Sequence, residues 1–299
     1  MPAIVSTNNW SSNIGPTIKK GFAFGFERIP EEVGLFHTRE TSNKESEKLM
    51  SFGDIGAMGE FSGSLDFDQV KENYNKTVTA REYAQAIGAQ KKLVLTDQVR
   101  AIEQISKALG RSARRRYLAD AYSWLINGFT TVNTGGDTLA LFSTAHTSNV
   151  GGATQSNSGT TAMSPAAVDA TRILMLRYNT NRDNAQFEST PDTLIVPLEL
   201  ESYAEEIVKS KGKVDALNNN INVHYGKYKV IASRLLVNST RWFMVDSKKM
   251  KEHNMWFDVQ KLELEKDVDF STKVSRWSAY CYYGFGFERW EHAYGQNPS

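Results

Sequence analysis

The chain has 299 residues, enough to bury one large core or two smaller ones. Its 35 lysine and arginine residues and 34 acidic residues leave a net charge of +1, whereas a protein dedicated to binding nucleic acid is usually far more basic. With Cys281 as its single cysteine, an internal disulfide is excluded, and a reducing cytoplasm suits the chain. It shows no export signal and no apolar run of about 18 residues, so we expect no membrane association.

The first forty residues form a weakly patterned segment. Glycine and proline recur in it, as in Gly15-Pro16 and at Pro30, and both residue types interrupt regular structure. Terminal segments of this kind are ordered mainly where they are tied down by other parts of an assembly. We therefore predict an extended N-terminal arm over residues 1–45.

Residues 46–95 contain extended stretches separated by glycines. These glycines lie at positions 53, 56, 59 and 63, and the spacing predicts a β-hairpin. Residues 79–90 carry a competing signal, because Thr79 and Glu82 match a helix capping box and good helix formers follow them. We favour a strand at 79–90, with a short helix as the alternative.

Between Thr96 and Gly128 the sequence predicts one unusually long helix. Apolar and small residues recur there every three or four positions, which is typical of a helix with one buried face. Thirty residues of helix span roughly 45 Å. Gly110 lies inside the segment and could allow a bend. The stripe consists of Val99, Ile102, Ile105, Leu109, Ala113, Tyr117, Ala121 and Trp124.

The second half of the chain mixes short helices and strands. A polar loop is expected over residues 130–163, and Ser164-Pro165 then places a cap and a proline where a helix to about Tyr178 would begin. Leu194 to Val196 reads as a short buried strand, and Pro197 opens a helix that ends near Gly212. Further strands are predicted at residues 228–236, 242–245 and 274–290. The fold class is α+β.

The residues that could carry chemistry do not form a convincing site. Ser143 and His146 could act as nucleophile and base, but acyl transfer also needs an orienting carboxylate and an oxyanion hole, and the chain has no G-x-S-x-G elbow. We interpret His146 as a residue that orders its loop. The histidines at 37, 146, 224, 253 and 292 lack metal-ligand spacing, and the glutamates at 199, 201, 205 and 206 suit a solvated helix face. We expect no catalytic residue, no cofactor and no metal.

Two segments could indicate nucleic-acid binding. Lys20 to Phe24 match the start of the RNP1 pattern, which then fails at Gly25 and Glu27. The arginines between Arg111 and Arg116 could contact phosphates. A solvated helix face, or pairing with acidic groups of a neighbouring subunit, is the interpretation that we favour for them.

The order of these elements and several short motifs resemble the major capsid proteins of tailed bacteriophages, and specifically the Mu-like major head subunits. Asn127-Gly128-Phe129 and the segment DTLALFSTAH from Asp137 to His146 are similar to that group's "D/G-x-x-LFS-x-x-H" motif, which leads to a loop bearing asparagines, as at 149 and 157 here. PDTLIVP at 191–197 resembles its "P-x-x-LVVP" strand, and RWFMVD at 241–246 its "W-[FY]-L-x-D" strand. The resemblance covers residues 40–290. Residues 91–98 depart from the group's usual "S-x-E-x-x-x-D-D" run.

This resemblance implies the HK97-type capsid fold. It would make residues 46–95 the E-loop hairpin and residues 96–163 the P-domain, with its spine helix and following loop. Residues 164–240 would be mainly A-domain, and residues 241–299 would supply strands that return to the P-domain. The implied function is a structural protein of the virion. Its copies would assemble in the host cytoplasm as hexamers and pentamers of an icosahedral shell. The shell would enclose phage DNA, touch it without sequence specificity, and carry a portal at one vertex.

Other readings of the sequence stay open. An encapsulin-like cargo shell shares the fold, a tail or decoration subunit of a phage is a further structural role, and a soluble enzyme that uses His146 is the most distant alternative. About 45 residues precede the hairpin, without a charged helical segment of the kind that acts as an internal scaffold in some relatives. We therefore expect a separate scaffolding protein and no large N-terminal cleavage.

Overall fold

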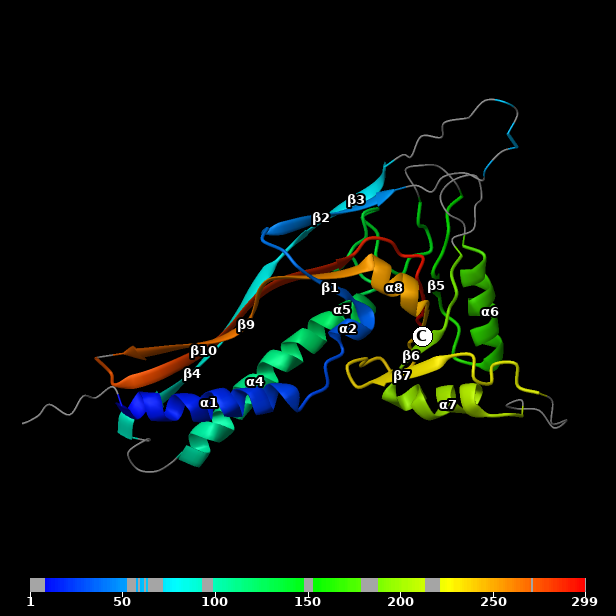
Figure 1. Ribbon diagram of the computed structural model, residues 1–299. Coiled ribbons are helices and arrows are strands. Elements are labelled where there is room, and N and C mark those ends of the chain that lie inside the picture. Colours follow the sequence, from blue (N-terminus) through cyan, green and yellow to red (C-terminus); the bar gives the residue numbers. More distant parts are fainter. Residues whose placement is uncertain are drawn as a thin grey trace, which may run out of the picture.

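The computed structural model of the chain describes residues 9–52, 58, 60, 61, 63, 72–92, 99–147, 153–178, 188–212, 221–269 and 271–298. Its described strands form a long four-stranded sheet in the order β1-β9-β10-β4, a five-stranded sheet in the order β5-β11-β8-β6-β7, and a two-stranded hairpin of β2 and β3. Two helices, α1 and α4, run below the long sheet in Figure 1, and the five-stranded sheet lies at the other end with α6 and α7. The α+β class predicted from the sequence is confirmed.

The long sheet is built on β9 (Asn254–Asp269) and β10 (Val274–Phe287), which pair antiparallel. β4 (Arg81–Gln90) pairs with the other edge of β10, and β1 (Thr38–Thr41) runs parallel to β9. Burial alternates along β10, as expected for a strand with one covered face. The strand favoured at 79–90 is confirmed, because pairing with β10 outweighs the local helix propensity.

The N-terminal segment is not extended as predicted. Residues 9–27 form helix α1 (Asn9–Glu27), which packs beside α4 (Val99–Ala121) under the long sheet. Glycine makes this packing possible: a Cβ added to Gly21 or Gly25 would come closer than 3.0 Å to Ser106 or to the backbone of Lys107. The glycines that suggested an irregular arm therefore allow two helix backbones to approach closely.

The long helix is confirmed over most of its predicted length. α4 continues as a helix without interruption through Gly110, and a Cβ at Gly110 would collide with the backbone of Phe22 in α1. Its buried face carries Ile102, Leu109 and Tyr117. After Tyr122 the short helix α5 (Ser123–Ile126) follows, and the chain leaves helical structure before Gly128. The predicted start at 96–98 lies outside the described residues.

The predicted hairpin is formed by β2 (Ser46–Phe52) and β3 (Glu72–Thr79), which pair antiparallel. Its glycines at 53, 56 and 59 lie outside the described residues. Figure 1 shows the hairpin rising away from the long sheet, with β4 continuing from its base. Helix α2 (Val33–Phe36) precedes β1 and buries both Val33 and Phe36. The hairpin is thus anchored at one end and projects from the body of the protein.

The five-stranded sheet contains the largest hydrophobic core of the described chain. β6 (Thr193–Pro197) is buried along its whole length and pairs with β7 (Lys229–Ser233) and β8 (Trp242–Val245). β11 (Ala293–Gln296) joins β8 to the two-residue strand β5 (Ser158–Gly159). Helix α7 (Leu198–Lys209) packs on β6 and β7, and α6 (Pro165–Leu176) packs on β8 and β11. Ser164 caps α6 as predicted, accepting a hydrogen bond from the amide of Ala167.

Helix α8 and strand β9 are among the elements that were not predicted. Helix α8 (Ser247–His253) begins at Asp246, whose carboxylate accepts hydrogen bonds from the amides of Lys248 and Lys249, both at 3.0 Å. Strand β9 follows it directly. In β9, leucines alternate with acidic residues, so one face is covered and the other is solvated. Alternation of leucines with acidic residues is typical of a strand, but no strand was predicted here from the sequence.

Candidate functional site

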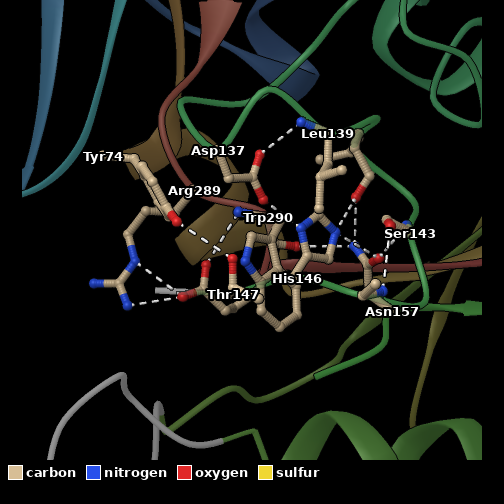
Figure 2. Close-up of polar contacts among 12 residues, drawn as sticks. Tyr74, Asp137, Leu139, Ser143, His146, Thr147, Asn157, Arg289 and Trp290 are labelled. Atoms are coloured by element: carbon tan, nitrogen blue, oxygen red, sulfur yellow. Dashed lines mark hydrogen bonds and ion pairs between the residues drawn. The ribbon is translucent and has the colours of Figure 1, made fainter. Parts of the chain in front are cut away.

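The most elaborate polar network in the described chain surrounds His146, in the loop between α5 and α6. The imidazole is 2 % exposed. Its Nδ1 lies 2.6 Å from Oδ2 of Asp137, and its Nε2 lies 3.1 Å from both the carbonyl oxygen of Leu141 and Oδ1 of Asn157. Figure 2 shows the ring held between these groups. Both ring nitrogens face oxygen acceptors inside the fold, so His146 has no lone pair directed at a reactive group.

Asn157 connects the loop to the C-terminal segment of the chain. Its side-chain oxygen accepts a hydrogen bond from the amide of Ser143 at 2.9 Å. Its side-chain nitrogen donates to the carbonyl oxygens of Leu141 at 2.7 Å and Ala293 at 3.2 Å. The residue is completely buried, so each of these bonds satisfies a group that water cannot reach.

The C-terminal segment contributes Trp290 and a buried ion pair to the same place. The indole of Trp290 stacks on His146, with ring centroids 4.3 Å apart and planes 6° from parallel. Beside it, the guanidinium of Arg289 lies 2.9 Å from the carboxylate of Glu291. Burial is the largest single effect and would by itself raise the pKa of Glu291. The charge and hydrogen bond of Arg289, a backbone hydrogen bond and the charge of His253 together outweigh it, so this pKa is below its usual range. The acid therefore stays ionised inside the fold.

Strand β3 of the hairpin is tied to this network as well. The hydroxyl of Tyr74 in β3 lies 3.3 Å from that of Thr147, as seen at the left of Figure 2. Lys76, also in β3, donates to the carbonyl oxygen of Thr134, and its ammonium lies 4.9 Å from the ring centroid of Phe287. Burial lowers the pKa of Lys76. We refer to Asp137, His146, Asn157 and Trp290, with these hairpin contacts, as the loop latch.

The contacts of His146 in the latch are those expected of a residue that orders its loop. The hydroxyl of Ser143 accepts a hydrogen bond from the amide of Ala145, and the nitrogens of His146 are bonded elsewhere. Sequence reasoning missed the roles of Asp137, Asn157 and Trp290. The first two lie in or after the segment that was recognised as a motif, so they were available as signals, but their partners are distant in sequence.

The other candidate residues are separate from the latch. Among the described residues, no group of three histidine, cysteine or acidic side chains could hold a metal ion. The described helices include none that is both long and apolar enough to cross a membrane. The four glutamates of α7 lie on its exposed or half-exposed side, and Glu205 pairs with Lys209 at 2.6 Å. Lys20 to Phe24 lie in helix α1 rather than in the strand that an RNP1 motif requires.

The arginines of α4 divide into two groups. Arg114 is buried against the ring of Phe26, with 3.9 Å between the guanidinium carbon and the ring centroid. Arg116 pairs with Asp120 at 2.6 Å, and the hydroxyl of Tyr283 donates to the same carboxylate at 2.6 Å. These two arginines hold the helix to its neighbours. Arg115 is exposed and Arg111 half-exposed, so both reach solvent.

Comparisons with known proteins place this architecture among phage capsids. A family model described as "Phage capsid protein" matches residues 73–295, a range that includes α4, the latch, three of the four strands of the long sheet and nearly all of the five-stranded sheet. No curated protein matches the chain.

Solved structures share its fold at low sequence identity. The capsid of bacteriophage JBD30 decorated with minor capsid protein trimers has a TM-score of 0.57 at 14% identity, covering 70% of this chain and 91% of that chain. The mature capsid of bacteriophage PhiM1 has a TM-score of 0.59 at 12% identity, covering 91% and 88%. A virus-like particle from Pyrococcus furiosus has a TM-score of 0.54 at 10% identity, covering 94% and 98%.

The likeness to these shells shows that the chain has the HK97-type capsid fold that its sequence resembles. The family match extends over most of the chain and identifies a structural role in the virion shell. This protein therefore belongs to the phage capsid protein family.

Proposed function

We propose that this chain is the major head subunit of a Mu-like tailed phage, and that its copies form hexamers and pentamers of an icosahedral shell. The observation that carries the proposal is the family match over residues 73–295, because it includes β3 of the hairpin, the long helix, three of the four strands of the long sheet and nearly all of the five-stranded sheet. In this assignment the hairpin of β2 and β3 is the E-loop, α4 is the spine helix, and the five-stranded sheet with α6 and α7 corresponds mainly to the A-domain.

The described part of the hairpin has the surface expected of a segment that another subunit covers. Phe52 is 47 % exposed and Phe61 is 69 % exposed, and Met58 is completely exposed. Exposed apolar side chains gathered on one projecting element mark an interaction surface. Covering them with a neighbouring subunit would contribute about 25 cal/mol per Å² of apolar area.

We propose that assembly takes place in the host cytoplasm with a separate scaffolding protein and a portal, and that the closed shell contains the phage DNA. The procapsid of bacteriophage JBD30 matches this chain with a TM-score of 0.55 over 98% of its length, which supports a comparable assembly route. The shell would then be the site at which this protein acts in the virion.

Electron microscopy of the purified chain tests this proposal. The chain is expressed with and without its neighbouring genes, separated by size, and imaged in negative stain. Closed angular particles, or rings of subunits, are expected when the correct partners are present. A monodisperse monomer or dimer under all these conditions would contradict the proposal and return attention to Ser143 and His146.

A cargo shell of the encapsulin type is the second candidate. The virus-like particle from Pyrococcus furiosus supports it, because its structure covers 94% of this chain and this chain covers 98% of it. The contents of particles purified from infected or induced cells distinguish the two functions. Nuclease-protected DNA of genome length supports the phage head, whereas a single enriched protein inside DNA-free particles supports the cargo shell.

A further inference from the structure

The two long helices carry the excess positive charge of the chain. Helices α1 and α4 together contain eight basic and three acidic residues, which gives them a net charge of +5. The whole chain has a net charge of +1, so everything outside these helices has a net charge of −4. The helix pair covers one face of the long sheet (Figure 1), and that face of the protein is therefore basic.

Within this helix layer the cations form a line. Arg100, Lys107, Arg111 and Arg115 are separated by seven, four and four residues, a spacing that puts them on one side of α4. From the first to the last, the line is roughly 22 Å long at 1.5 Å per residue. Lys20 of α1 lies beside this line, where its charge acts on Glu103. We call these five residues the basic stripe.

One carboxylate shows how densely the cations gather at one end of the stripe. Glu103 accepts a contact from the ammonium of Lys107 at 2.6 Å. This bond and the charge of Lys107, followed by the charges of Lys20 and Arg100, lower the pKa of Glu103. Three cations thus share one exposed acid, and the local charge is positive.

At the other end of the stripe, fewer acidic groups of the same chain offset the positive charge. Arg114 and Arg116 are engaged with Phe26 and with Asp120, as described above. By contrast, Arg111 and Arg115 form no ion pair with any residue in the described ranges, and Nε of Arg115 donates to the backbone oxygen of Arg111. The fold does not use the charges of these two side chains, so they are available to an external anion.

The face of the long sheet that points away from the helices is acidic. In β9 the acidic residues Glu263, Glu265 and Asp267 alternate with Leu262 and Leu264, and the leucines pack toward the helices. The acids therefore point away from the helix layer. Lys261 and Arg276 share the acidic face and offset only part of its charge. One sheet and one layer of helices thus separate a basic surface from an acidic one.

We propose that the basic stripe binds phosphate groups of the packaged DNA, so that the helix layer faces the interior of the shell and the acidic face of the sheet faces outward. This inference rests on the proposed function and deepens it by naming the surface that meets the genome. Duplex DNA carries one charge per about 1.7 Å, so the stripe lies along about 13 phosphates. Arginine fits phosphate through paired hydrogen bonds, and such contacts carry no sequence preference.

A binding measurement on the unassembled full-length chain tests the proposal. The probe is a fluorescent DNA duplex of about 20 base pairs, titrated at several salt concentrations between about 50 and 200 mM. The test variant combines Arg100→Gln, Arg111→Gln and Arg115→Gln. The matched control combines Lys227→Gln, Lys229→Gln and Lys248→Gln, three exposed lysines next to the five-stranded sheet that change the net charge equally.

Removing three phosphate contacts should make the negative slope of log affinity against log salt shallower by about 2–3, whereas the control should keep the slope of the unmodified chain. Equal slopes for the two variants would overturn the proposal. Tighter binding of a poly-glutamate chain than of the duplex, lost in the stripe variant, would assign the surface to an acidic protein instead. The same samples are imaged for shells: absence of shells from the unmodified chain contradicts the proposed function, whereas shells with an unchanged DNA slope contradict only this inference.

Discussion

The imidazole of His146 lies flat on the indole of Trp290, with 4.3 Å between ring centroids, although one residue belongs to a mid-chain loop and the other to the C-terminal segment. Asn157 bridges the same two parts of the chain through the carbonyl oxygens of Leu141 and Ala293. The loop latch therefore closes the polar loop over the end of the five-stranded sheet by contacts that are buried and directional.

Replacing Asn157 with alanine should destabilise the protein strongly. The change removes the partner of the Ser143 amide, the side-chain donor to the carbonyl oxygen of Ala293 and one of the two groups beside the carbonyl oxygen of Leu141. Each buried group left unsatisfied costs about 1–3 kcal/mol. We expect a loss on the order of 3 kcal/mol, or roughly 5–10 °C in melting temperature. Thermal unfolding followed by circular dichroism measures it. Ser143→Ala is the control and should stay within about 0.5 kcal/mol. Equal shifts for both variants would contradict the latch.

Stability should fall in mild acid because of buried histidines. Burial lowers the pKa of His37 to about 4, and burial also lowers the pKa of His292. An unfolded histidine has a pKa of about 6.5. Between these values the unfolded chain binds more protons than the folded chain, so the free energy of unfolding decreases as the pH falls from 6.5 to 4. For His37 alone the loss is on the order of 3 kcal/mol.

Denaturant unfolding at a series of pH values between 7 and 4 measures this effect. His37→Phe, which keeps an aromatic ring beside Trp256, should flatten the pH dependence, because the group that takes up the proton is gone. A variant that retains the full slope would show that other groups dominate the acid response.

Alanine substitutions at two glycines of α1 and α4 should have different effects on the free energy of unfolding. Gly110→Ala should destabilise the protein by about 1–3 kcal/mol, because the new methyl group would collide with the backbone of Phe22. Gly15→Ala, in α1 itself, has no atom within 4 Å of the new group, so it should be neutral or stabilising by up to about 1 kcal/mol. The melting temperatures of the two variants, compared with that of the unmodified chain, test this prediction. A stabilised Gly110→Ala would mean that the helices are not in close contact.

Exposed apolar residues of the hairpin should matter for assembly rather than folding. Met58→Ser combined with Phe61→Ser removes apolar surface that is exposed in the isolated chain, so the melting temperature of unassembled protein should change little. Particle formation, counted in negative stain, should fall sharply. Val132→Ser, at a position that is 73 % exposed outside the hairpin, is the control. Normal particle yield from the double variant would contradict a role of these side chains in subunit contacts.

The elements that the sequence predicted are those whose periodicity is local. The helix stripe through Leu109 and Tyr117, the cap at Ser164 and the buried strand at Leu194 are each specified by their own neighbours in the chain. The strand at 79–90 was ambiguous because its local signals favour a helix, and only the partner strand β10 decides against it.

The features that the sequence could not supply depend on distant partners. Gly15-Pro16 weakened the helix signal, so residues 9–27 were predicted to belong to an extended arm. The close approach of α4 at Gly21 and Gly25 could be seen only in the folded chain. Within the latch, His146 was recognised as structural, but its stacking partner is Trp290, and no spacing rule connects the two. Charge, by contrast, was visible in the sequence as an arginine cluster, but its division into buried and exposed members required the packing of Phe26 and Asp120.

The connection between the hairpin and the long sheet has a mechanical consequence. Only Ala80 separates β3 from β4, and its amide is bonded to the carbonyl oxygen of Glu45 at 2.9 Å. β4 then pairs with β10 along ten consecutive positions, from Arg81 to Gln90. The hairpin is therefore a stiff lever rather than a hinged flap. A force applied to its tip is carried into the middle of the subunit as shear along a ladder of hydrogen bonds.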